Sequence, residues 1–147
     1  LIGGPIPGEG NVISGNEEYG LFLEGTGDMV QGNLIGTDRT GTFPLGNGAY
    51  TSLNDGVFVT GPNDVIGGAQ PGAGNVISAN GGNGILVEHA FISALGGSVL
   101  IQGNLIGTDV TGTASLGNGG AGIYVVATRN AAIGGAVPGA GNVISSN

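Results

Sequence analysis

Two aspartates lie in nearly identical segments, GTDRTGT at 36–42 and GTDVTGT at 107–113. Aspartate and threonine oxygens, together with loop carbonyls, are ligands that calcium accepts, so Asp38 and Asp109 are the candidate metal ligands. An aspartate in such a loop also stabilises a turn through its own side chain. Because the GGxGxD nonapeptide of calcium-binding repeat proteins is missing, the turn is the simpler interpretation and calcium the alternative. No other cofactor is predicted.

Two glutamates and the only histidine are the candidates for acid–base chemistry. Glu24 and Glu88 follow alternating apolar segments. On stacked strands two layers apart their carboxyls would be separated by about 9.6 Å, near the upper end of the range for inverting glycosidases. Such a pair needs carboxyls in unlike environments, and the sequence shows no such asymmetry. His89 is a conceivable base without an acid partner beside it, so no catalytic residue is assigned.

The composition excludes several partners. The 147 residues include ten acids, two arginines and no lysine, for a net charge of −8. Nucleic acids and anionic membranes are bound by clusters of basic residues, so neither is an expected partner. No run of residues approaches the roughly 18 apolar residues of a membrane span. The absence of cysteine excludes disulfides and thiolate metal sites.

The chain repeats itself throughout. Copies of two segments recur: NVISGN at 11–16, NVISAN at 75–80, NVISSN at 142–147, and QGNLIGTD at 31–38 and 102–109. The triplet IGG begins at 2, 66 and 133, which gives a repeat of 64 to 67 residues. Glycine followed by alternating apolar residues, as in GLFL at 20–23 and GIYV at 122–125, predicts strands with one buried face. Such self-similarity indicates a repeat architecture.

Three strands recur in a fixed order. The first is the glycine-led alternation. The second centres on Ile2, Val30, Ile66, Ile101 and Ile133, and the third on Ile13, Ile35, Ile77, Ile106 and Ile144. The predicted fold is all-β: a right-handed parallel β-helix, or solenoid, with three short strands per coil, about four to five coils and two coils per repeat. Because the chain begins and ends within repeats, residues 1–147 are expected to be a single segment of a longer repeat protein.

Polar residues recur in register with the third strand. Two residues before each isoleucine lies an asparagine, and these are Asn11, Asn33, Asn75, Asn104 and Asn142. Their stacked amides are predicted to form a hydrogen-bonded ladder. Three residues after each isoleucine lie Asn16, Asp38, Asn80, Asp109 and Asn147. This second column is predicted to be a ladder in which asparagine alternates with aspartate, so that no carboxylate stacks on another.

An outward apolar column is predicted on the first strand. Its members are Phe22, Phe58, Leu86 and Tyr124. A continuous exposed apolar stripe usually marks a partner, here either a sugar chain that stacks on the rings or another copy of the protein. The alternative is that the loops at 38–55, 90–98 and 109–121 fold back and cover the column.

With these motifs the sequence resembles right-handed parallel β-helices of the pectin-lyase-like superfamily, and more narrowly the GNxIGTDxTGT/NVISGN repeat arrays of secreted bacterial proteins. The resemblance covers essentially the whole chain and implies the ladder at Asn11, Asn33, Asn75, Asn104 and Asn142. Enzymes of the superfamily place their chemistry on the outer face of the first strand. Neither Arg39 nor Arg129 lies on that strand, and no closely spaced aspartates do.

The sequence therefore predicts an extracellular bacterial structural solenoid, such as part of a fibre, stalk, adhesin or surface protein, that spans distance and makes lateral or end-to-end contacts with itself without catalysis. The alternative is a carbohydrate-binding or carbohydrate-active β-helix, similar to polysaccharide lyases and hydrolases, whose catalytic coils lie outside these residues. Ice binding is a weaker third candidate, because it usually requires a flat, regular face of threonines and Thr37 and Thr108 recur only in every second coil. The full-length sequence separates the first two classes, since many copies of this unit indicate a fibre.

Overall fold

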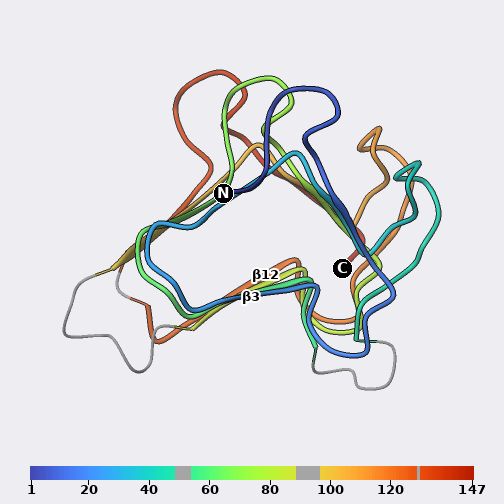
Figure 1. The fold of residues 1–147 in the computed structure, drawn as a ribbon, viewed down its shortest axis with the longest axis horizontal. Helices are drawn as coiled ribbons and strands as arrows, with labels where there is room; N and C mark the ends of the chain where they lie inside the picture. The colour runs from blue at the N-terminus through green and yellow to red at the C-terminus, as the bar shows by residue number, and fades with distance from the viewer. Residues whose placement is uncertain (49–53, 89–96, 129) are drawn as a thin grey trace.

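The structure is a computed structural model that describes residues 1–48, 54–88, 97–128 and 130–147. Within these residues the protein is all-β, with fourteen short strands, three parallel sheets and no helix. Viewed along the stack, the strands of each sheet overlap and the three sheets surround a common interior, with the longer loops projecting outward (Figure 1).

The strands of each sheet come from regularly spaced parts of the chain. Sheet A contains β1 (Ile2–Gly3), β4 (Met29–Gln31), β7 (Asp64–Gly67), β10 (Ser98–Gln102) and β13 (Asn130–Ile133). Sheet B contains β2 (Val12–Ile13), β5 (Leu34–Ile35), β8 (Val76–Ile77), β11 (Leu105–Ile106) and β14 (Val143–Ile144). Sheet C contains β3 (Leu21–Leu23), β6 (Val57–Val59), β9 (Ile85–Glu88) and β12 (Ile123–Val126).

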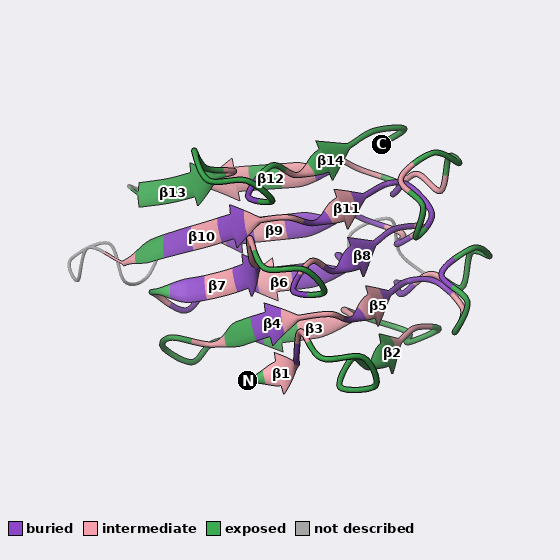
Figure 2. Ribbon diagram, turned by 90° about the horizontal axis from the view of Figure 1, so that it is seen from above, coloured by how far each residue is buried: buried purple, intermediate pink, exposed green. Residues whose placement is uncertain are grey.

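Along the chain the strands enter sheets A, B and C in turn, and each strand from β1 to β11 pairs in parallel with the strand three places further on. We call each successive set of A, B and C strands a layer. Figure 2 shows the layers following one another from β1 to β14, with the buried residues concentrated in the middle layers. The all-β class and the stacking of repeated parallel strands are thus confirmed, and the arrangement fits a parallel β-solenoid.

The core consists of columns of equivalent apolar residues that face the interior. In sheet A, Ile2 pairs with Val30, Val30 with Ile66, Ile66 with Ile101, and Ile101 with Ile133. In sheet B the same holds for Ile13, Ile35, Ile77, Ile106 and Ile144. Both columns have the predicted membership and order. Members of the middle layers are fully buried, and each such side chain contributes about 2 kcal/mol of transfer free energy.

Glycine is required where the chain turns from sheet A to sheet B. Gly67 has a φ of 85°, in the left-handed region that other residues rarely adopt. A Cβ atom at this position would also collide with the backbone oxygen of Gln102 and with the side chain of Asn104. The first glycine of the IGG triplet therefore lets one layer approach the next at the corner where the asparagines lie.

Substitution of Ile77 tests the column model. Ile77 is fully buried between Ile35 and Ile106, so Ile77→Asp places an isolated charge in the core. We expect the free energy of unfolding to fall by at least about 4 kcal/mol, measured by urea unfolding followed by circular dichroism. Val110→Asp, at an exposed loop position, is the control and should leave the transition nearly unchanged. An Ile77→Asp protein with the parent's spectrum and melting temperature would refute the buried columns.

Candidate functional site

The first asparagine column forms a continuous hydrogen-bonded ladder. Each Nδ2 donates to the Oδ1 of the asparagine in the next layer over 2.9 to 3.0 Å, in the order Asn11, Asn33, Asn75, Asn104 and Asn142. A central rung shows how the amide is used. The Nδ2 of Asn75 also donates to the backbone oxygen of Val30, and its Oδ1 accepts the backbone N–H of Asn33. Asn75 is 1% exposed, and each polar atom of its side chain is hydrogen-bonded.

A second ladder runs beside sheet B, but its membership differs from the prediction. Its rungs are Asn16, Asn47, Asn80, Asn118 and Asn147, joined by Nδ2-to-Oδ1 bonds of 2.7 to 3.0 Å. Asn16, Asn80 and Asn147 are in the predicted column. The prediction that Asp38 and Asp109 are rungs was wrong, because Asn47 and Asn118 occupy those places.

The path of the chain after β5 explains why Asn47 takes the place predicted for Asp38. An antiparallel bridge between Thr37 and Pro44 closes a loop that carries Asp38 away from the column. The chain returns at Leu45, whose N–H donates to the oxygen of Gly36, and Asn47 then enters the ladder. A rung must donate as well as accept, and an ionised aspartate only accepts. The repeated LGNG at 45–48 and 116–119 is the sequence signal that identifies these rungs.

The two predicted calcium ligands stabilise their own loops. The hydroxyl of Thr111 donates to both carboxylate oxygens of Asp109 over 2.7 and 2.9 Å, and the N–H groups of Thr113 and Ala114 donate over 3.1 Å. The bond from Thr111, followed by that from Ala114, lowers the pKa of Asp109. The carboxylate thus acts as the acceptor of a closed turn.

Asp38 is bonded in the same way by Thr40, Thr42 and Phe43. Burial opposes ionisation of Asp38, yet these hydrogen bonds outweigh it and its pKa is also lowered. Among the described residues, no three His, Cys, Asp or Glu side chains lie together in a way that would hold a metal ion. Calcium binding stays a prediction. Each of the two loops would supply one carboxylate to the ion, from Asp38 or from Asp109.

The structure does not gather the other acid–base candidates into one group. Glu24 follows β3 and Glu88 ends β9, and β6 lies between these strands in sheet C. Glu24 and Glu88 are thus two layers apart, as the sequence predicts. His89 lies outside the described residues.

A buried carboxyl that the sequence analysis did not single out lies just before β6. Asp55 is 1% exposed. Its Oδ1 accepts the backbone N–H and the side-chain Nδ2 of Asn83 over 2.7 and 2.8 Å, whereas its Oδ2 has no hydrogen-bond partner among the described residues. Burial raises the pKa of Asp55, although the bonds from Asn83 oppose the shift.

The outward apolar column of sheet C is present in the predicted order. Phe22 pairs with Phe58, Phe58 with Leu86, and Leu86 with Tyr124. The rings of Phe22 and Phe58 are stacked, with centroids 5.1 Å apart and planes inclined by 10°. Phe22 is 49% exposed and Tyr124 is 51% exposed, whereas Phe58 and Leu86 are half-buried, so the column is open mainly at its two ends. The loop segments 49–53 and 90–96, which were predicted to be possible covers, lie outside the described residues.

Tyr19 extends this column. Its ring lies 5.8 Å from that of Phe22 and 5.2 Å from that of Phe58, measured between centroids. We name the set Tyr19, Phe22, Phe58, Leu86 and Tyr124 the aromatic surface. Burial, followed by the negative charges of Asp55, Glu18 and Glu88, raises the pKa of Tyr19. The aromatic surface is therefore bordered by acidic groups.

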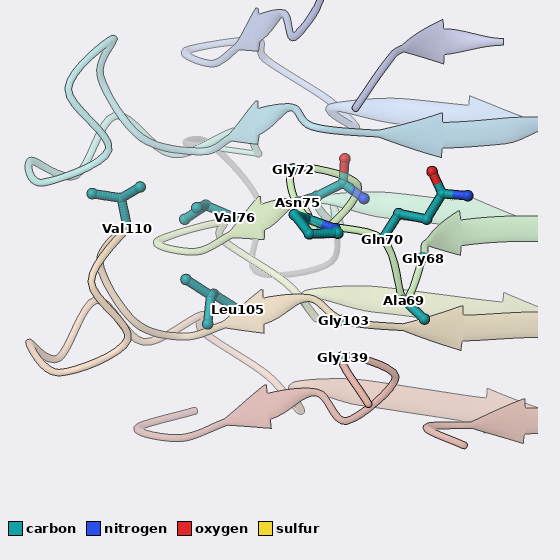
Figure 3. A pocket seen from close by; sticks show the side chains of 12 residues that line it. Gly68, Ala69, Gln70, Gly72, Asn75, Val76, Gly103, Leu105, Val110 and Gly139 are labelled. Carbon is teal, nitrogen blue, oxygen red and sulfur yellow. The ribbon is translucent and has the colours of Figure 1, made fainter. Parts of the chain in front are cut away.

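Two hollows of about 430 and 370 Å³ lie over sheet B. They are built from equivalent residues of successive repeats: Val76, Leu105, Val110 and Gly139 in the larger, and Val12, Leu34, Arg39 and Gly72 in the smaller. Figure 3 shows Val76, Leu105 and Val110 gathered at one end of the larger hollow, with Ala69 and Gln70 at the other. The hollows are thus a repeating surface feature, in which Arg39 replaces the apolar Val110.

Exchanging asparagine for aspartate at position 47, and aspartate for asparagine at position 38, tests the membership of the second ladder. Asn47 donates to the oxygen of Ile13 and to Oδ1 of Asn80, and Asn47→Asp removes both donations and buries a charge. We expect a loss of roughly 2 to 5 kcal/mol in the free energy of unfolding, measured with urea at neutral pH. Asp38→Asn should cost less, because the amide oxygen still accepts bonds within its loop. The reverse order of the two losses would restore Asp38 to the ladder.

The buried Asp55 predicts a dependence of stability on pH. Because burial raises its pKa above the ordinary value of 3.8, the folded protein holds this proton more tightly than the unfolded chain. The resulting stability is fully present below about pH 3.8 and is lost as the pH rises through the folded-state pKa.

The variant Asp55→Asn should therefore be more stable than the parent at neutral pH, and the difference should shrink as the pH falls towards about 4. Urea unfolding at a series of pH values measures this, with the exposed Glu17→Gln as the control. A difference that stays constant with pH would show that Asp55 does not titrate between the two states.

The described residues contain no helix long and apolar enough to span a membrane.

Comparison with protein-family models, curated proteins and solved structures finds no match to the chain. The ladders, the aromatic surface and the hollows are therefore the features from which a function can be inferred.

Proposed function

We propose that the chain is a segment of a right-handed parallel β-helix of the pectin-lyase-like, GNxIGTDxTGT repeat type, with three strands in each coil and two coils in each repeat. The observation that carries this proposal is that both asparagine ladders run from the first layer to the last beside the core columns. A ladder keeps neighbouring layers in register, and layers of this kind can be added without a change in cross-section.

The function we propose is that of an extracellular structural solenoid, as part of a bacterial fibre, stalk, adhesin or other surface protein. Its work would be to span distance and to present a periodic surface for lateral contacts, without catalysis. Two features support this. The buried asparagines are occupied with bonds between layers, and the hollows recur with the repeat of the chain.

Insertion of extra repeats tests this proposal. Residues 66–132 run from one IGG triplet to the residue before the next, so additional copies can be inserted before Ile133 with the columns in register. Each copy adds two layers. Small-angle X-ray scattering should show the longest dimension growing by about 10 Å per copy, with an unchanged cross-sectional radius.

The control is a shuffled insert of the same composition, which should not extend the rod. A cross-section that increases with each copy of the true repeat, or a flexible chain appended to the original body, would contradict the solenoid.

Carbohydrate binding is the second candidate, and the stacked rings of Phe22 and Phe58 favour it because sugar rings pack on aromatic faces. Affinity electrophoresis through gels that contain plant or bacterial polysaccharides measures it directly. Retardation that is lost in Phe22→Ala and kept in Phe43→Ala, which alters an exposed ring outside the aromatic surface, would support this candidate over a purely structural role.

A further inference from the structure

The aromatic surface is a line of apolar side chains along the direction in which the layers stack, and the rings at its ends, Phe22 and Tyr124, are about half exposed. Phe22 and Phe58 lie parallel in successive layers, and Tyr19 packs against both. Leu86 and Tyr124 continue the line through the next two layers. Adjacent layers are about 4.8 Å apart, so the four strands of sheet C form a narrow apolar track that suits an extended ligand better than a compact one.

Negative charge surrounds this track. Glu24 follows β3 and is exposed, Glu88 ends β9 and is half-buried, and the exposed Glu18 lies close enough to Tyr19 to act on its hydroxyl. The track therefore combines aromatic faces with carboxylates, which is the combination that attracts an organic cation.

Positive charge is absent from the described part of this surface. The chain contains no lysine and two arginines. Arg39 lines a hollow over sheet B, and Arg129 lies outside the described residues. A second copy of the chain laid face to face on the track would oppose carboxylates with carboxylates, and its net charge is also −8. Charge complementarity thus favours a basic partner over self-pairing on this face.

We propose that the aromatic surface binds an extended basic segment of another protein through its arginine side chains. A guanidinium group stacks on an aromatic face and at the same time pairs with a carboxylate through two parallel hydrogen bonds. A lysine ammonium is a strongly hydrated point charge and matches the track less well. The proposal rests on the proposed function only in treating sheet C as a contact face, and it names the partner of that face.

The probe is a short fluorescein-labelled peptide in which arginine alternates with threonine, and its binding to the full chain is measured by fluorescence anisotropy. We expect saturable binding in low-salt buffer, weaker binding at about 150 mM salt, and tighter binding than that of the same peptide with lysine in place of arginine. Phe22→Leu keeps an apolar side chain and removes a ring, and it should weaken binding about threefold to tenfold. Glu88→Gln should weaken it about twofold to fivefold.

Matched controls lie outside the aromatic surface. Phe43→Leu alters an exposed ring, and Glu9→Gln alters an exposed acid in the loop between β1 and β2. Both should bind within about twofold of the parent, and circular dichroism melting of every variant reports whether it is folded. Equal losses in the control variants, no preference for arginine over lysine, or no saturable binding in low-salt buffer would each overturn the proposal.

One further outcome would overturn the proposal in favour of carbohydrate. In that outcome the chain binds a glycan and not the peptide, and Phe22→Leu abolishes glycan binding. The scattering experiment on inserted repeats does not depend on any ligand. Failure of the peptide experiment and failure of the solenoid proposal are therefore distinguishable.

Discussion

The two-sided hydrogen bonding of asparagine is the constraint on which the rest of the structure depends. A buried amide accepts at Oδ1 and donates from Nδ2, and in this chain it does both towards neighbouring layers. A buried polar group without a partner costs about 1 to 3 kcal/mol, so each rung needs another rung at one strand spacing. That requirement fixes the register of the layers, and the isoleucine column of sheet B follows from it because each of its members lies two residues after a rung of the first ladder.

The fold is largely predictable from the sequence because its signals are local and repeated. Every member of the two isoleucine columns can be found by counting along the chain, and so can every rung of the first ladder. Counting along the chain fails for the second ladder at Asp38 and Asp109, because it assumes that the chain continues in the same layer directly after the strand. The bridge between Thr37 and Pro44 shows that it leaves and returns. The true rungs, Asn47 and Asn118, lie beyond the loop.

Other features depend on contacts between layers and have no signal within one layer. The carboxyl of Asp55 accepts hydrogen bonds from Asn83 of the next layer and acts electrostatically on Tyr19 of the preceding layer. The position of the Tyr19 ring over Phe22 and Phe58 is likewise invisible to strand alternation, because Tyr19 precedes the strand. The outward column was predicted correctly in its members, and Glu24 and Glu88 were found beside it, whereas the nearness of Glu18 to the ring of Tyr19 required the structure.

A repeated interior allows the exterior to vary. Because the ladders and columns supply the same contacts in every layer, a substitution on the outer face of a strand leaves the bonds between layers intact. Sheet B carries hollows bordered by glycines, of which one contains Arg39 and its equivalent contains Val110. Sheet C carries aromatic rings among carboxylates. Asp55 marks the limit of this freedom. Its carboxyl is buried and accepts hydrogen bonds from Asn83 of the next layer, and burial raises its pKa because the charged form is poorly solvated there.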